Sequence, residues 1–153
     1  MDKVYDNEVQ KELPVIGGAI ETVERIQKII PIVAYLTIRP ESVSEGTAFW
    51  LEKYHFPQAQ IIARPVIVEK SKGHQWKAEV LEYLYPQVAG IIDDNTSIVQ
   101  YFNKTYKGVI FAYSNNEVPK SDIKVLPCPA WEDVYKQVVS FSLSGRAGSG
   151  RDK

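Results

Sequence analysis

The chain has 153 residues, of which 44% are hydrophobic, and its 18 basic and 19 acidic side chains leave a net charge of -1. This length can bury one ordinary hydrophobic core, and the composition excludes a disordered chain. The balanced charge excludes a surface built to bind nucleic acid or an anionic membrane, and no apolar stretch approaches the ~18 residues that span a bilayer. We therefore expect one soluble, cytoplasmic domain that binds any anion locally.

Both ends of the chain differ in composition from the middle. Residues 1–13 form a polar segment that does not resemble a signal peptide. Residues 142–153 are rich in Ser, Gly, Arg and Asp, which cannot pack a core, and they predict a flexible tail. The domain is therefore expected over residues 14–141.

The chain has one cysteine, Cys128, which lies between Pro127 and Pro129. A single cysteine excludes an internal disulfide and fits a reducing compartment. No base, cation or metal-ligand spacing surrounds it in the sequence, so the pattern predicts an unreactive thiol in a loop.

The first predicted elements are a helix, a buried strand and a second helix. Apolar residues recur at helical spacing over residues 20–30, and residues 32–37 form a short apolar run typical of a buried strand. Ser42 and Glu45 have the spacing of a capping box. This motif predicts a helix that begins at Ser42 and ends before Pro57.

The same alternation continues through the rest of the chain. We predict strands at residues 60–63, 88–92 and 108–113, and helices at residues 76–84, after Asn95, and at residues 131–141. Strands that alternate with helices indicate a parallel sheet with right-handed crossovers. The predicted fold is a three-layer α/β/α, Rossmann-like parallel sheet.

An acidic pair, Asp93 and Asp94, directly follows one predicted buried strand and precedes a helix cap. Open α/β sheets place their ligands at this edge. Mg²⁺ binds through one or two carboxylates together with phosphate oxygens and water, so the pair predicts a Mg²⁺ site. The alternative is a plain strand-to-helix turn in which Asp94 or Asn95 caps the helix.

Several further side chains are predicted at the same edge. The hydroxyl of Thr37 and the N–H of Ile38 could hold phosphate oxygens, or the hydroxyl bonds only locally. Lys77 would neutralise phosphate and carboxylates as a point charge, or it is a solvated helix residue. Arg39 and Arg64, each before a proline just past a strand, would contact substrate or pair on the surface.

The order of these residues resembles a known family. The segments "YLTIRPESVSEGTAFWLEKYHFPQAQIIARP", "WKAEVLEYLYP" and "VAGIIDDN" are similar to motifs two to four of the haloacid dehalogenase superfamily of phosphatases, over roughly residues 14–140. The resemblance places Thr37 in motif two, Lys77 in motif three and Asp93-Asp94 in motif four. It implies a haloacid dehalogenase-like sheet, a Mg²⁺ cofactor, and catalytic or phosphate-binding roles for Thr37 and Lys77.

The chain departs from that family at the first motif. In the family, an Asp-x-Asp after the first strand supplies the nucleophile and a second acid. Here Asp2 and Asp6 lie four residues apart and no apolar strand precedes them, so no nucleophile is assigned. The family's first strand is central, between the strands that end at Thr37 and at Asp93, and it is missing here.

The missing strand leaves several ways to complete the sheet. The chain is a C-terminal piece of a longer protein, or the two strands pair directly, or they borrow a strand from another copy. We expect self-association into a homodimer, with residues 11–16 as the donated strand.

Two functions remain open. In the first, the complete protein is a Mg²⁺-dependent phosphohydrolase that acts on a small phosphorylated substrate through an aspartyl-phosphate. In the second, the chain is a catalytically inactive phosphate-binding or protein-interaction domain of the same fold. In both cases we expect the isolated chain to be inactive, because no nucleophile is visible.

Overall fold

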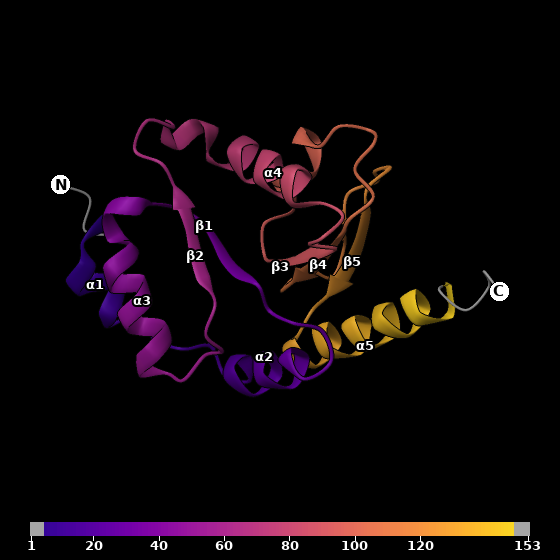
Figure 1. Cartoon of the computed structure of the whole chain (residues 1–153), viewed down its shortest axis with the longest axis horizontal. Coiled ribbons are helices and arrows are strands. Elements are labelled where there is room, and N and C mark those ends of the chain that lie inside the picture. The colour runs from indigo at the N-terminus through magenta and orange to yellow at the C-terminus, as the bar shows by residue number, and fades with distance from the viewer. Residues whose placement is uncertain (1–4, 149–153) are drawn as a thin grey trace.

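A computed structural model describes residues 5–148 and has a mixed α/β fold (Figure 1). The elements are α1 (Asn7–Lys11), α2 (Ala19–Gln27), β1 (Ala34–Pro40), η2 (Glu41–Val43), α3 (Ser44–Lys53), β2 (Gln60–Arg64), η3 (Lys70–Lys72), α4 (Gly73–Leu84), β3 (Gly90–Asp93), η4 (Thr96–Tyr101), β4 (Val109–Tyr113), β5 (Lys124–Cys128) and α5 (Trp131–Gly148). The three η elements are short 3-10 helices. Within residues 5–148, no helix has both the length and the apolar character needed to cross a bilayer.

The strands form two parallel sheets instead of the single sheet that the sequence predicts. β1 pairs with β2, with Ala34 opposite Gln60, and in the second sheet β4 lies between β3 and β5. The parallel direction agrees with the helix-and-strand alternation. Direct pairing of β1 with β3, one of the expected ways to complete the sheet, does not occur among the described strands.

Two hydrophobic clusters cover the two faces of the three-stranded sheet. Ile26 of α2, Phe111 of β4 and Val138 of α5 belong to one cluster. Leu81 of α4 and Ile110 of β4 belong to the other. Neighbouring residues of β4 enter opposite clusters because successive side chains of a strand point to opposite faces. Helices therefore cover the sheet from both sides (Figure 1).

The strand ends differ by a few residues from those that the sequence predicts. β1 begins at Ala34 and extends to Pro40. β3 begins at Gly90, because Val88 is still part of the turn after α4 and donates its N–H to the Leu84 carbonyl. Gly90 is required where β3 starts, since an added Cβ would lie 2.4 Å from the carbonyl oxygen of Val109.

The predicted capping box at the start of α3 is wrong. The N-cap position is Val43, which makes no side-chain cap hydrogen bond. The acceptor comes instead from α1, because the N–H of Gly46 donates to Oδ1 of Asn7 at 2.7 Å. Asn7 also donates through Nδ2 to the Ser42 carbonyl at 3.1 Å. A side chain from the polar N-terminal segment thus accepts a backbone N–H of the first turn of α3, for which the neighbouring sequence provides no acceptor.

The polar N-terminal segment is therefore partly structured. α1 packs against α3, and an added Cβ on Gly46 would lie only 2.5 Å from the Asn7 carbonyl oxygen. Gln10 of α1 is 1% exposed. Lys11 is the last residue of α1, and Leu13 is fixed by the indole N–H of Trp50, which donates to its carbonyl at 2.7 Å. Residues 11–16 do not form the expected strand.

β5 was not expected from the sequence, which places Cys128 in a loop. The strand contains Pro127 in its ladder opposite Ala112. A proline is tolerated there because β5 is an edge strand, whose N–H groups on one side need no strand partner. Cys128 ends this strand and is fully buried. Burial, followed by the charge of Asp133, raises the pKa of the Cys128 thiol to about 11.

We expect Cys128 to be unreactive in the folded protein, because its thiol is buried and protonated at neutral pH. Alkylation by iodoacetamide at pH 8 should be on the order of 100-fold slower than in urea-unfolded chain, since reaction requires local opening. The raised pKa adds stability below the ordinary value of 9.0, and that stability is lost as pH rises towards 11. Equal labelling rates with and without urea would contradict this burial.

The C-terminal helix is longer than predicted. α5 continues from Trp131 to Gly148, whereas the sequence predicts an end at residue 141 and a flexible tail. Phe141 packs on Phe111, which anchors the middle of the helix. Extension from a packed helix needs no new nucleus, so Ser- and Gly-containing turns can follow it. Residues 149–153 of the predicted tail lie outside the described residues.

Candidate functional site

The start of α4 brings the C-terminal ends of β1 and β3 to one edge of the molecule. An added Cβ on Gly73 would lie 3.2 Å from Cβ of Ile38 in β1. One turn later, Lys77 Nζ lies 2.5 Å from Oδ2 of Asp93, the last residue of β3. The absence of a side chain at Gly73 lets α4 approach β1 closely. The same helix therefore contacts both sheets where their strands end.

Lys77 and Asp93 form a buried ion pair. Their side chains are 9% and 6% exposed. Oδ1 of Asp93 also accepts the backbone N–H of Asn95 at 3.1 Å, so both carboxylate oxygens of Asp93 are hydrogen-bonded. Removing two charges from water is costly and requires good geometry and full hydrogen bonding. Of the two interpretations of Lys77, a solvated helix residue or a charge at the sheet edge, the structure therefore excludes the first.

Asp94 is exposed beside this pair, and its main chain is fixed by a loop of the second sheet. Asn115, just past β4, donates through Nδ2 to the carbonyls of Asp94 and Tyr113, both at 2.8 Å. Reduced hydration, a hydrogen bond with Asp93 and the charge of Asp93 raise the pKa of Asp94. Sequence reasoning missed Asn115, although its position just after a strand of the parallel sheet was the available signal.

The residues predicted around Thr37 do not all face this edge. Oγ1 of Thr37 accepts the backbone N–H of Arg39 at 3.1 Å, the local bond that was its alternative interpretation. The Ile38 carbonyl accepts Nε of Arg64 at 2.8 Å. Arg39 hydrogen-bonds through its guanidinium to Gln10 of α1. Both guanidinium groups therefore bond to acceptors within the protein, with Arg64 in a buried position, and their contact with a substrate stays a prediction.

His74 and Asn95 connect α4 to the turn after β3. Nε2 of His74 lies 3.3 Å from Nδ2 of Asn95, while Oδ1 of Asn95 accepts the N–H of Ser97 and caps η4. The Asn95 cap was expected, but the element that it begins is a 3-10 helix. Nδ1 of His74 is buried and has no hydrogen-bond partner in the described part of the chain. This imidazole nitrogen is therefore an unpaired polar atom on a ring that lies beside Asn95.

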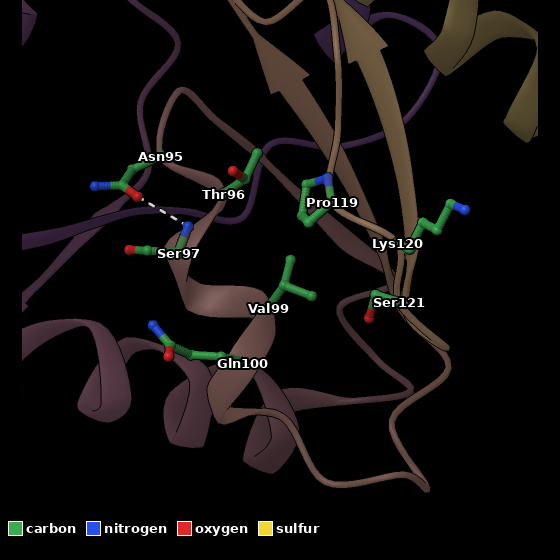
Figure 2. Close-up of a pocket in the computed structure, with 8 residues that line it drawn as sticks. All are labelled: Asn95, Thr96, Ser97, Val99, Gln100, Pro119, Lys120 and Ser121. Atoms are coloured by element: carbon green, nitrogen blue, oxygen red, sulfur yellow. Dashed lines mark hydrogen bonds between the residues drawn. The ribbon is translucent and has the colours of Figure 1, made fainter.

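A pocket of about 430 Å³ lies next to the acidic pair, between η4 and the loop before β5. Figure 2 shows Thr96 and Val99 of η4 on one side and Pro119, Lys120 and Ser121 on the other. Its lining combines hydroxyl, amide and ammonium groups with two apolar side chains, Val99 and Pro119.

The carboxylates at this edge fit Mg²⁺ only together with other oxygen ligands. Asp94 offers an exposed carboxylate, and Asp93 keeps lone pairs beyond its bonds to Lys77 and Asn95. Within residues 5–148, no group of three or more His, Cys, Asp or Glu side chains is arranged to hold a metal ion. Because Mg²⁺ keeps several waters and takes phosphate oxygens, one or two carboxylates suffice.

Comparisons with protein-family models, with curated proteins and with solved structures gave no match to this chain. The functional interpretation therefore rests on the geometry of this edge and on the order of its residues in the sequence.

Proposed function

We propose that this edge binds the phosphate group of a small phosphorylated substrate together with Mg²⁺, as part of a haloacid dehalogenase-like phosphohydrolase. The observation that supports this most is the buried contact between Lys77 and Asp93 at the end of β3. Lysine and aspartate are seldom buried unless they are paired, and this pair holds both charges at the edge where parallel α/β sheets bind their ligands.

Each residue would have a limited role. Lys77 would hold the Asp93 carboxylate in one orientation and add positive charge near a bound phosphate. Asp93 and Asp94 would supply the carboxylates for Mg²⁺, which neutralises phosphate charge when it is bound. Thr37 would contribute its hydroxyl once the local bond to Arg39 is exchanged for a phosphate oxygen. The hydrolysis itself would need a nucleophilic carboxylate for an aspartyl-phosphate, and none is assigned in this chain.

A second function is favoured by one specific observation. The charged atoms of Lys77 and Asp93 bond to each other, and Thr37 bonds locally. Side chains that already bond to other groups of the protein can stabilise the fold, whether or not they also bind a ligand. The alternative is therefore a catalytically inactive domain of the same fold that binds phosphate or a protein through this edge.

Replacement of Asp94 by Asn is expected to weaken binding of inorganic phosphate in the presence of Mg²⁺ by about tenfold, the loss of ~1.4 kcal/mol. Asp94 is exposed and its side chain is not part of the Lys77 ion pair, so the fold should be preserved. Isothermal titration calorimetry measures this binding, which we expect in the millimolar range for the unchanged protein, since Mg²⁺ binds sparse carboxylate sites weakly.

The matched control is Asp122→Asn, which removes the same charge at an exposed position just before β5. The strands are parallel, so Asp122 lies at the edge of the sheet where the strands begin, and Asp93 lies at the edge where they end. Equal phosphate binding by Asp94→Asn and Asp122→Asn would refute the site. A parallel assay with an aryl phosphate separates the two functions. We expect no Mg²⁺-dependent hydrolysis by this chain, and hydrolysis that Asp94→Asn abolishes would reveal a nucleophile that is not assigned here.

A further inference from the structure

The most exposed hydrophobic side chains lie at the two ends of α4, which runs along one side of the molecule (Figure 1). Among the large hydrophobic side chains of residues 5–148, the three highest exposed fractions are 92% at Ile67, 87% at Tyr83 and 68% at Val66. Val66 and Ile67 lie in the loop that follows β2 and precedes η3, and Tyr83 lies in the last turn of α4. Hydrophobic residues that gather on one surface mark an interaction site.

One solvent-facing surface connects these two ends. Its exposed residues recur every three or four positions, from the residue before α4 to the last turn of the helix: Lys72, Gln75, Glu79 and Tyr83. Residues at this spacing share one face of a helix, which we call the outer face of α4. The loop before η3 joins this face, because Val68 of the loop and Trp76 of α4 line one hollow of about 180 Å³ there.

The loop before η3 is held in place by the rest of the fold. The N–H of Val66 donates to Oε1 of Glu41 at 3.1 Å. The guanidinium of Arg64, a buried residue, hydrogen-bonds to the Val68 carbonyl. A loop fixed at both of these points presents Val66 and Ile67 in one conformation. Binding through it therefore costs little further conformational entropy.

The outer face of α4 carries one charge of each sign without an ion-pair partner. Neither Lys72 nor Glu79 forms an ion pair within the part of the chain that the structure describes. Glu79 accepts a hydrogen bond from Gln75, whose Nε2 lies 3.1 Å from its Oε1. Lys72 and Glu79 are seven positions apart, which is about 10 Å along a helix and too far for a pair within one copy.

We propose that the outer face of α4 and the loop before η3 bind a second copy of this chain, with the two α4 helices antiparallel around a two-fold axis near Gln75. In this arrangement Lys72 of each copy lies beside Glu79 of the other, so one interface forms two ion pairs. The loop of each copy, with Ile67, lies opposite the last turn of the other α4, with Tyr83. Opposite charges at positions that a two-fold axis exchanges select a second copy over a partner of one charge.

This interface is separate from the candidate site and from the expected strand exchange through residues 11–16. Lys77 lies on the buried face of α4, so the proposal does not depend on the proposed reaction. One helix of about three turns and one loop make a small interface, for which we expect a dissociation constant on the order of 0.1 mM. Denaturation experiments at micromolar concentration then report on the monomer.

Sedimentation equilibrium of the full chain, over a dilution series from well below to well above that constant, tests the proposal. Lys72→Glu brings two carboxylates together at each pair, and Glu79→Lys brings two ammonium groups together. Each variant alone should therefore self-associate at least ~10-fold more weakly than the unchanged chain. An equimolar mixture of the two variants should regain the affinity of the unchanged chain, because both pairs in the mixed dimer are again of opposite charge.

Two further variants separate this surface from a general effect of charge. Lys28→Glu makes the same charge change at an exposed lysine that ends α2, and should alter the dissociation constant by less than ~2-fold. Ile67→Ser should weaken association by about tenfold, because it removes an apolar side chain from the contact.

Three outcomes would overturn the proposal. The first is an unchanged chain that stays monomeric at every concentration, which would assign the surface to a different protein. The second is a dimer that Lys72→Glu and Glu79→Lys leave intact, which would place the interface elsewhere. The third is a mixture that associates no better than each variant alone. Circular dichroism of every variant shows that a loss of association is not a loss of fold.

Discussion

Replacement of Lys77 by Met is expected to lower the free energy of unfolding by ~3 to 5 kcal/mol, the usual cost of leaving one partner of a buried ion pair uncompensated. The side chains of Lys77 and Asp93 are both nearly inaccessible to water, and Nζ of Lys77 lies 2.5 Å from Oδ2 of Asp93. Without the ammonium, the Asp93 carboxylate would remain buried with only the Asn95 N–H as a described donor. Urea denaturation followed by circular dichroism measures the loss.

Two further variants identify the cause of that loss. Lys77→Met combined with Asp93→Asn removes both charges and retains a side-chain oxygen for the Asn95 N–H, so it should recover about 2 kcal/mol or more. Lys72→Met changes an exposed lysine just before α4 and should shift stability by no more than ~0.5 kcal/mol. A double variant as unstable as Lys77→Met would show that lost packing, and not an unpaired charge, is responsible.

Replacement of Ile110 by Ala is expected to cost about 2 to 5 kcal/mol, because it removes a side chain that is 0% exposed. Ile110 lies in β4, the central strand of its sheet, and joins the cluster formed with α4 and η4. The deletion leaves a cavity that packed neighbours on the sheet can fill only in part. Thermal and urea unfolding both measure this change.

Ile67→Ala provides the matched control for that experiment. It makes the same substitution at a position that is 92% exposed, so its effect should remain within ~0.5 kcal/mol. If the two variants lost equal stability, the assignment of the core to the β4 side of the molecule would be contradicted.

The candidate site could be predicted in part. Lys77 and Asp93 carry charges next to elements with clear periodicity, and the edge rule for parallel sheets places them near each other. The structure brings these two together. Arg39 and Asn115 could not be placed in this way, because the acceptors that hold them, Gln10 and the Asp94 carbonyl, come from other parts of the chain.

The fold was predictable where local pattern decides it. Apolar runs and helical spacing identified β1 to β4 and the main helices, since hydrophobic periodicity is a property of neighbouring residues. β5 was missed because Pro127 reads as an interruption, and only its position at the sheet edge makes that proline acceptable. The end of α5 was predicted too early, because composition does not show that adding residues to an already packed helix costs little free energy.

The sequence by itself determined the class of this protein, a mixed α/β chain with parallel strands, and predicted that Lys77 and Asp93 lie at one edge of the sheet. Only the tertiary structure decided that the strands divide into two sheets and that Asn7 of α1 satisfies the start of α3. Periodicity is set by residues a few positions apart, whereas strand pairing and helix capping across elements depend on partners distant in the sequence.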